Sequence, residues 1–333
     1  MPTMTAVGSF EGLPIDDPDA LRDIEIPTPE LRPHDVLVRV QAVSVNPVDI
    51  KRRHSLQPSA TPTILGFDAA GTVEAVGAQV NTLRVGDEVW YAGDVTRPGT
   101  NAEYHAVDER LVARKPTTLS FAEAAALPLT TITAWETLFE RFGLATDSTG
   151  DLLILGAAGG VGSAMIQLAK ARTQVRVIAT ASRDESQQWC RTLGADVVVD
   201  HRELRDQVLG VAPSGIDYLF SPHSRGNVQV YADIVRPFGH ITAIDEPEGL
   251  DLLPLKSKSI AWHWELMFTR SMFDYDMIAQ QRLLADAASM VDAGTLRSTL
   301  TTTIEHFDAA GLQQAHRLVE SGSMVGKVVI HRS

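Results

Sequence analysis

The 333-residue chain has 44% hydrophobic and 21% charged residues, the composition of a soluble globular protein that should fold as two domains. Its formal charge of -13 disfavours a nucleic-acid partner or an anionic membrane surface, because phosphates would be repelled. No apolar run reaches the roughly 18 residues of a membrane span, and the N-terminal residues do not form a signal peptide. A single cysteine, Cys190, excludes an intrachain disulfide and suits a cytoplasmic location.

Residues 1 to about 120 are predicted to be rich in β-strand. Short β-branched runs at 36–40 and 71–76, and a turn-to-strand step at 86–90, lie among proline, glycine and aspartate turn signals. Many short strands joined by turns are typical of a partly closed β-barrel.

The pattern changes near Phe121, where a helical stretch broken by Pro128 begins. From Asp151 onward strands alternate with helices, which indicates a parallel sheet covered on both faces, a doubly wound domain. The expected strands are 152–155, 175–180, 197–199, 216–220 and 240–244, with a helix at 184–193. A helical segment at 276–293 and a strand at 327–330 close the chain. Because this last strand resembles those of the N-terminal region, residues after about 265 should rejoin the first domain.

The segment 151–170, DLLILGAAGGVGSAMIQLAK, reads as strand, glycine turn and helix. Gly159 and Gly162 lie where a dinucleotide fold needs a bare backbone, for approach to the pyrophosphate and for close packing of helix on strand. The helix that opens near Gly160 would present free N–H groups to the anion. We therefore predict a dinucleotide site at this turn, with an ordinary strand–helix turn as the alternative. The residues assigned to it are Gly156, Gly159, Gly160, Val161 and Gly162.

The residues at the C-terminal end of the second predicted strand are expected to determine whether NAD or NADP binds. An Asp or Glu about 20 residues past the glycines would bind the ribose 2′-OH of NAD. Ser182 and Arg183 stand there instead, a hydroxyl and a planar cation that suit the 2′-phosphate of NADPH. The alternative for Arg183 is a solvated surface arginine.

Together these motifs resemble the medium-chain dehydrogenase/reductase superfamily, and within it the zinc-independent quinone oxidoreductases of the zeta-crystallin type. The resemblance spans nearly the whole chain and includes the segments 44–49, 65–71, 85–89, 126–134, 156–162 and 326–329. The segment 263–268, HWELMF, is similar to a subgroup labelled zinc-type alcohol dehydrogenase-like. The resemblance implies a GroES-like catalytic domain at 1–122 and 266–333, a Rossmann domain at 123–265, and a homodimer.

Zinc members of this superfamily hold their catalytic metal with a Cys, a His-Glu pair and a later Cys or Asp. Here Asn46 stands at the first position and Phe67-Asp68 at the pair. Because zinc needs three or four N, S or O ligands, we expect no zinc. Scattered histidines such as His54, His105 and His263 are the alternative ligands.

Without a Lewis acid the substrate must accept hydride unaided, as quinones and α,β-unsaturated carbonyl compounds do. By resemblance, Asn46 lies beside the nicotinamide and hydrogen-bonds the reacting oxygen; the alternative is a turn residue before Pro47. Thr133 matches a contact of the carboxamide. His201 matches a position near the adenosine end, with a plain loop residue as the alternative. Lys327, which follows Gly326, is expected within reach of the cofactor cleft, with a strand-edge lysine as the alternative. The usual tyrosine after the Asn-Pro stretch is missing, so His54 or water would donate the proton.

An aromatic and methionine-rich run, comprising Trp264, Met267 and Phe268 with Trp262 just before them, could line the substrate pocket, a dimer interface or the core. Two other functions remain open at this point. One is a zinc-type alcohol dehydrogenase, and the other is a non-catalytic NADPH-binding protein.

Overall fold

The computed structural model describes residues 2–332, and the chain forms two compact units. The first unit comprises residues 1–132 and 268–333, and the second comprises residues 133–267. The sequence analysis set the first boundary ten residues earlier, at 122/123, where helical character begins. The structure differs because helix α2 (Phe121–Ala125) packs against strands of the first unit, β3 (Asp35–Ser44), β5 (Ala69–Val76) and β16 (Lys327–His331).

The first unit is built on a seven-stranded sheet in which β15, β16, β3, β5, β6 and β8 follow one another and β7 pairs with β3. All pairings are antiparallel except β15 with β16. The valines of β3 at 36, 38, 40 and 43 lie in one core with Val73, Val89 and Ile330. The remaining strands are β6 (Glu88–Tyr91), β7 (Tyr104–Asp108), β8 (Ala113–Arg114) and β15 (Leu300–Ile304).

A second, three-stranded sheet with the order β2-β1-β4 belongs to the same unit. Its strands are β1 (Thr3–Ser9), β2 (Arg22–Pro27) and β4 (Thr63–Ile64). The helical elements of the unit are α1 (Pro47–Ser55), η1 (Glu109–Leu111), α2, α8 (Thr269–Met272), α9 (Ile278–Asp292) and α10 (Ala309–Glu320), and most of α3 (Pro128–Trp135) also lies in it.

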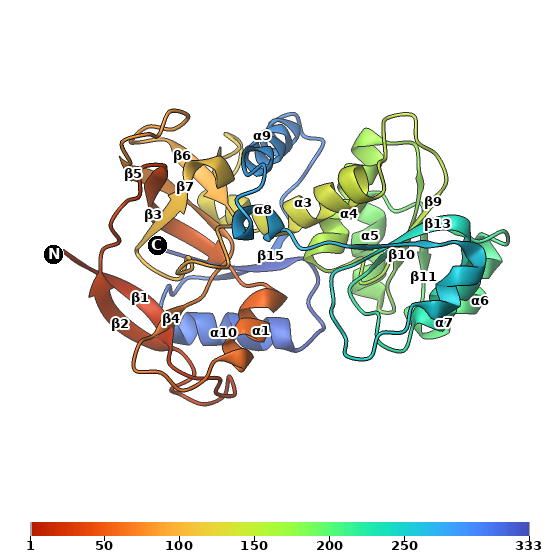
Figure 1. The fold of residues 1–333 in the computed structure, drawn as a ribbon, viewed down its shortest axis with the longest axis horizontal. Helices are drawn as coiled ribbons and strands as arrows, with labels where there is room; N and C mark the ends of the chain where they lie inside the picture. Colours follow the sequence, from red (N-terminus) through yellow and green to blue (C-terminus); the bar gives the residue numbers. More distant parts are fainter. Residues whose placement is uncertain (1, 333) are drawn as a thin grey trace. The chain divides into compact units, whose positions relative to one another are not determined.

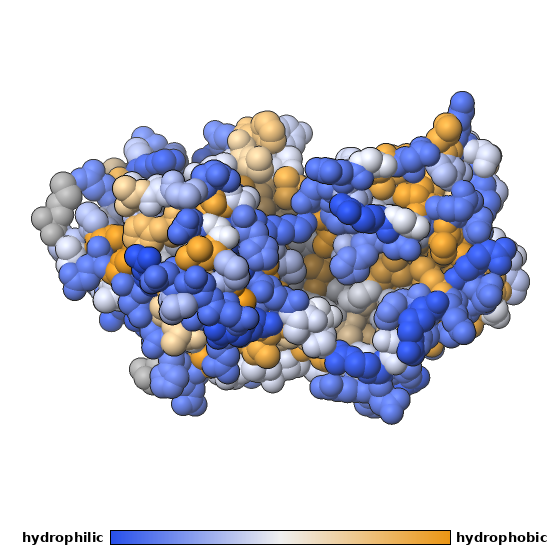
Figure 2. Space-filling view, turned by 90° about the horizontal axis from the view of Figure 1, so that it is seen from below, coloured by the Kyte–Doolittle hydropathy of each residue, from blue (hydrophilic) through white to orange (hydrophobic). Residues whose placement is uncertain are grey.

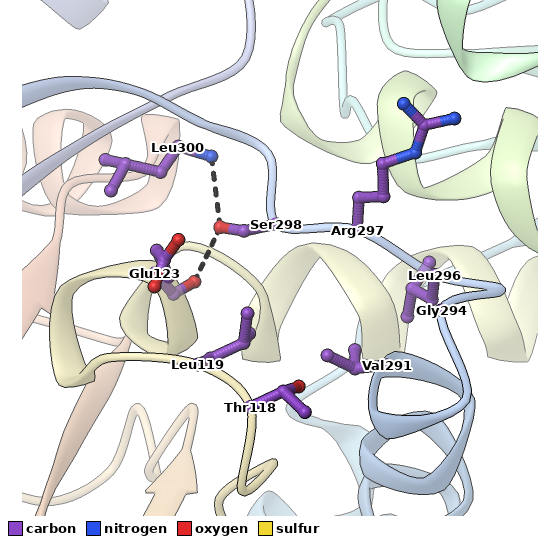
Figure 3. Close-up of a pocket in the computed structure, with 9 residues that line it drawn as sticks. All are labelled: Thr118, Leu119, Glu123, Val291, Gly294, Leu296, Arg297, Ser298 and Leu300. Carbon is purple, nitrogen blue, oxygen red and sulfur yellow. Dashed lines mark hydrogen bonds between the residues drawn. The ribbon is translucent and has the colours of Figure 1, made fainter.

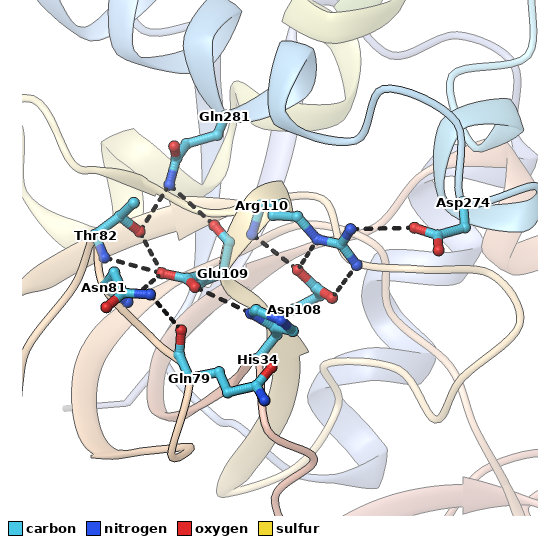
Figure 4. Close-up of polar contacts among 9 residues, drawn as sticks. All are labelled: His34, Gln79, Asn81, Thr82, Asp108, Glu109, Arg110, Asp274 and Gln281. Carbon is cyan, nitrogen blue, oxygen red and sulfur yellow. Dashed lines mark hydrogen bonds and ion pairs between the residues drawn. The ribbon is translucent and has the colours of Figure 1, made fainter.

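The return of the chain to the first unit, expected from the last strand, is visible in the polar contacts of α9 (Figure 4). Gln281 Nε2 donates to the carbonyl of Glu109 at 3.0 Å and to Thr82 Oγ1 at 3.1 Å. The carboxylate of Glu109 in turn accepts from the backbone N–H of Asn81 and Thr82. This network fastens a C-terminal helix to loops about 170 to 200 residues earlier in the chain.

The second unit is a six-stranded parallel sheet with the order β11-β10-β9-β12-β13-β14. This is the doubly wound dinucleotide-binding order, which reverses between β9 and β12. The strands are β9 (Asp151–Ile154), β10 (Arg176–Thr180), β11 (Val197–Val199), β12 (Ile216–Ser221), β13 (Val235–Ala243) and β14 (Ala261–Trp264). The α/β fold expected from the sequence is confirmed, with β14 as a strand that the sequence analysis did not find.

Helices cover both faces of this sheet (Figure 1). Leu153 packs in a core with α6 (Leu204–Val211) and α7 (Val228–Ile234), and its neighbours Leu152 and Ile154, which point to the other face, are equally buried. The helical elements not yet named are the π-helix η2 (Glu136–Arg141), α4 (Gly160–Arg172), α5 (Asp184–Leu193), η3 (His201–Glu203) and η4 (Leu253–Lys258). Cys190 is buried on α5, and burial raises the pKa of its thiol to about 11.

Figure 2 shows hydrophilic and hydrophobic residues interspersed over the face in view. Within residues 2–332, every helix is too short or too polar to cross a bilayer.

Candidate functional site

The glycine turn follows β9, beside the point where the strand order of the second unit reverses. Gly156 has a φ of +62°, a left-handed conformation that glycine adopts without strain. A Cβ at Gly162 would lie 2.5 Å from the Cα of Ala157, so α4 can pack this closely on the turn only with a glycine there. Gly159 is the N-cap of α4, and the first backbone N–H groups of that helix have no partner within it. These features fit a bound pyrophosphate.

The residues assigned to the adenosine end lie after the two neighbouring strands. Gly156 N donates to Thr180 Oγ1 at 3.0 Å, which ties the glycine turn to the end of β10. Ser182 is half-buried, and Arg183 is exposed at the N-cap of α5. His201 is exposed in η3, just past β11. The fold thus brings the glycine turn, Ser182, Arg183 and His201 to the carboxyl ends of three adjacent strands. Thr133 is buried on α3, at the first residue of the second unit.

In the first unit, Asn46 immediately precedes helix α1, which Pro47 begins. The carboxylate of Asp49 accepts hydrogen bonds from Asn46 N and Gly66 N, both at 2.8 Å. Asn46 and Asp49 are fully buried, and burial raises the pKa of Asp49 to about 7. Asp49 therefore fixes the start of α1 against the turn that precedes Phe67.

A buried ammonium group completes this site. Lys327 Nζ, from the first residue of β16, donates to Asn46 Oδ1 at 2.6 Å and to the carbonyl of Val45 at 3.1 Å, and lies 3.4 Å from Asp68 Oδ2. Asn46 Nδ2 donates to the same oxygen of Asp68 at 2.8 Å, and Leu129 N donates to its other oxygen. We call Asn46, Asp68 and Lys327 the ammonium cluster. Burial raises the pKa of Asp68 and lowers the pKa of Lys327, while their mutual attraction opposes both shifts.

Asp68 is the member of this cluster to which the sequence analysis gave no role. The sequence analysis noted the residue only as the second member of the Phe67-Asp68 pair. Its role could not be seen there, because its partner Lys327 lies 259 positions away. An aspartate just before an apolar strand is the one local signal that a buried carboxylate is present.

The ammonium cluster does not fit a zinc ion. Zinc needs three or four N, S or O ligands, whereas Asn46 Oδ1 and Asp68 Oδ2 are both directed at the Lys327 ammonium, beside which a divalent cation would be repelled. In the part of the chain that the structure describes, no three His, Cys, Asp or Glu side chains are grouped to hold a metal.

His54 is not brought to this cluster. It lies in the last turn of α1, eight residues from Asn46, or roughly 12 Å along the helix axis at 1.5 Å per residue. Its ring contacts Arg53 Nη2 at 2.7 Å, and Arg53 also pairs with Glu320. His54 is half-exposed.

The residues assigned to the substrate pocket are divided between the units. Trp264 ends the edge strand β14, with half of its side chain exposed, and stacks edge-to-face on Trp262. Met267 is buried in the second unit. Phe268 begins the C-terminal part of the first unit, where it packs edge-to-face on Phe67 at 5.3 Å.

The first unit also has a cavity of about 410 Å³, formed by residues from 118–123 and 291–300 (Figure 3). On the wall of this cavity, Ser298 Oγ donates to the carbonyl of Glu123 at 2.7 Å and accepts from Leu300 N at 3.3 Å. None of the residues that the sequence analysis assigned to a site lines this cavity.

Two protein families match this chain, the alcohol dehydrogenase GroES-like domain over residues 32–117 and the zinc-binding dehydrogenase over residues 193–330. The chain is 42% identical over 315 residues to a zinc-type alcohol dehydrogenase-like protein of Staphylococcus aureus (strain COL), with 92% of each chain covered. The chain belongs to the medium-chain dehydrogenase/reductase superfamily. It is thus an oxidoreductase of a superfamily whose members bind nicotinamide cofactors.

Two further relatives extend this assignment within the superfamily. One is a Rhizobium etli CFN 42 protein of known crystal structure, described provisionally as a zinc-dependent alcohol dehydrogenase. It superposes on this chain with a TM-score of 0.95 at 49% sequence identity, and the match covers 100% of this chain and 99% of that one. The 2-methylene-furan-3-one reductase of Solanum lycopersicum is 32% identical over 320 residues, which cover 92% of this chain and 74% of the relative. The names of these relatives therefore include both zinc-type or zinc-dependent alcohol dehydrogenases and a reductase of 2-methylene-furan-3-one.

Proposed function

We propose that this superfamily member is an NADPH-dependent reductase that transfers hydride to a quinone or an α,β-unsaturated carbonyl compound without a metal. The observation that carries the proposal is the Lys327 ammonium, bonded to Asn46 and close to Asp68 at positions where zinc members carry ligands. Without a Lewis acid the acceptor must delocalise charge onto its own conjugated oxygen. The enone-reductase name of the tomato relative supports the same substrate class.

The coenzyme would be held by the second unit. We assign the pyrophosphate to the glycine turn and the N-terminus of α4, the 2′-phosphate to Ser182 and Arg183, the adenosine end to His201, and the carboxamide to Thr133. When bound, NADPH supplies the hydride. The protein's residues then bind it, orient it and exclude water.

Asn46 would contribute one hydrogen bond to the reacting oxygen. One Nδ2 hydrogen is committed to Asp68 at 2.8 Å, while the carbonyl of Ser44 lies 3.5 Å from the same nitrogen, too far for a strong bond. The second hydrogen is therefore the one that we assign to the substrate. Lys327 keeps the amide in this orientation by donating to its oxygen.

The proposal is tested by mixing the purified protein with NADPH and a panel of quinones and enones, beginning with phenanthrenequinone, and following nicotinamide absorbance. Turnover without added metal, undiminished by a chelator, is the expected result. NADPH binding without turnover on any acceptor would favour a non-catalytic binding protein instead. Stoichiometric zinc, with activity lost to the chelator, would favour the zinc-type alcohol dehydrogenase that the names of two relatives suggest.

The coenzyme assignment has its own test in Arg183→Glu. Loss of a charge-assisted phosphate contact should weaken NADPH binding by about 1.5–3 kcal/mol and leave NADH binding nearly unchanged. Equal losses for both coenzymes would remove the 2′-phosphate assignment. The proposal also includes a homodimer in the cytoplasm, and sedimentation of the purified protein measures its oligomeric state.

A further inference from the structure

Two buried glutamates and a partly exposed arginine of the second unit form a cluster that the proposed function does not use. Glu136 and Arg141 are the first and last residues of the π-helix η2, a rare element that is frequently found at functional sites. Glu265 follows the last residue of β14, at the carboxyl edge of the parallel sheet. Glu136 and Glu265 are buried, and the Glu265 side chain has no exposed surface. We call these three residues the carboxyl cluster.

The contacts within the carboxyl cluster require a proton. Arg141 Nε donates to Glu265 Oε2 at 2.9 Å, and the two carboxyl groups of Glu136 and Glu265 share a hydrogen bond. Two carboxyl groups can bond to each other only when one of them is protonated. No group within residues 2–332 donates to the buried Oε1 of Glu265. Burial, followed by the neighbouring Glu136, raises the pKa of Glu265 to about 9, so the proton is retained at neutral pH.

The carboxyl cluster also joins two particular segments of the chain. The chain passes from the first unit to the second at Ile132/Thr133 and returns at Met267/Phe268. Glu136 lies about one helical turn after Thr133, and Glu265 lies two residues before Met267. We call residues 133–142 and 261–267 the connecting segments. Two side-chain contacts link them: that of Glu265 with Glu136 and Arg141, and the edge-to-face packing of Phe142 on His263, with ring centroids 6.4 Å apart.

We propose that the carboxyl cluster is a positioning device that holds the two connecting segments together while its two carboxyl groups share a proton, and that it thereby fixes Thr133 for the coenzyme. The role in coenzyme binding rests on the proposed function; the link between the segments does not. When the proton is lost, two adjacent buried carboxylates face a single cation, Arg141, and repel each other. The connecting segments should then loosen, and coenzyme affinity should fall.

Other titratable groups beside the carboxyl cluster do not account for this behaviour. His263 on β14 faces Arg141, and burial lowers its pKa, away from the range in which Glu265 titrates. His240 on β13 stacks on His263 at 5.4 Å, with 3.1 Å between Nδ1 and Nε2. A change at alkaline pH is therefore assigned to the carboxyl pair.

The test compares Glu265→Gln with the wild-type protein, both without coenzyme, by amide hydrogen exchange corrected for the intrinsic effect of pH. Glutamine keeps the shape of the side chain and cannot ionise. In the wild type, exchange within the connecting segments should accelerate by about tenfold between about pH 8 and pH 10, because the deprotonated fraction rises by about that factor across a pKa of about 9. Glu265→Gln should abolish the acceleration. Glu140→Gln, an equal change of charge at an exposed position of the same helix, is the matched control and should behave like the wild type.

A parallel titration of NADPH by fluorescence tests the positioning role. The wild-type Kd should rise over the same pH range, and the Glu265→Gln Kd should not. A pH transition that persists in Glu265→Gln would overturn the proposal, as would an exchange transition that coenzyme affinity does not follow. If Glu265→Gln instead lost stability equally at all pH values and kept the pH transition, the carboxyl cluster would have only a structural role. That result would also overturn the proposal. Failure of every quinone and enone to react would contradict the proposed function alone, because the exchange experiment needs no turnover.

Discussion

The first unit neutralises its buried carboxylate Asp68 with an ammonium group, whereas the second unit relies on a shared proton as well as an arginine. In the ammonium cluster, Lys327 begins β16, which is hydrogen-bonded to strands on both sides, and donates to fixed oxygens. In the carboxyl cluster, Arg141 reaches only one oxygen of Glu265, and the neighbouring Glu136 is a second acid. The Lys327 nitrogen can still donate hydrogen bonds to Asn46 and Val45 if its extra proton is lost, whereas the bond between Glu136 and Glu265 exists only while one of them holds a proton. The first arrangement therefore suits a permanent scaffold around Asn46, and the second suits a response to pH.

Removing the ammonium should have the largest effect. Lys327→Met leaves the Asp68 carboxylate buried without its cation, and we expect unfolding free energy to fall by about 3–5 kcal/mol in denaturant titrations. The double variant Lys327→Met/Asp68→Asn should recover much of this loss, because no buried charge then remains unpaired. A single variant within about 1 kcal/mol of the wild type would show that the ammonium cluster is not a charged network.

Removing the cation of the second unit should cost less. Arg141→Met takes away one charge-assisted hydrogen bond, for which we expect a loss of about 1.5–3 kcal/mol at neutral pH. The loss is smaller than that of Lys327→Met because Glu265 can remain protonated beside Glu136. A larger loss for Arg141→Met than for Lys327→Met in the same titration would reverse the comparison.

The two units should also differ in the pH range over which they lose stability. Asp49 and Glu265 both have pKa values raised by folding, to about 7 and about 9, so each contributes stability that is present below its unfolded pKa and lost as pH rises through its folded pKa. The part due to Asp49 should end near pH 7, while that due to Glu265 continues to about pH 9. The difference in unfolding free energy between wild type and Glu265→Gln should therefore change above pH 7 with a slope of at most about 1.4 kcal/mol per pH unit. A constant difference between pH 7 and pH 9 would refute the assignment.

The smallest effect is expected outside both clusters, at His54. Because the structure places this residue at the far end of α1 from Asn46, His54→Gln should change kcat by less than about twofold at saturating acceptor, well under the factor of 100 or more of a general acid. A loss of that larger size would restore His54 as the proton donor suggested by the sequence.

Local patterns predicted the elements that local residues determine. The glycine turn, helix α5 and the parallel strands β9 to β12 follow from periodicity and from glycine and aspartate signals within a few residues. Strand β14 was missed because it is only four residues long and has no β-branched residue, so the alternation of its two tryptophans is too short to indicate a strand.

The site was less predictable, because its contacts join distant residues. Asn46 and Lys327 could be named from motifs, but their hydrogen bond spans 281 positions and no spacing rule implies it. The sequence analysis assigned no role to Glu136 or Glu265. Only the fold shows that the two acids share one hydrogen bond.

The position of Lys327 in the chain has a consequence for protein synthesis. Because the first unit is discontinuous, a ribosome that has reached residue 267 has completed the second unit, while strands β15 and β16 of the first are still to be made. Asp68 therefore has no counter-ion until β16 has been translated. A nascent chain interrupted before β16 would contain a complete second unit and an incomplete first unit. Asp68 would then lack the Lys327 ammonium, and we expect quality-control proteases to remove such a product.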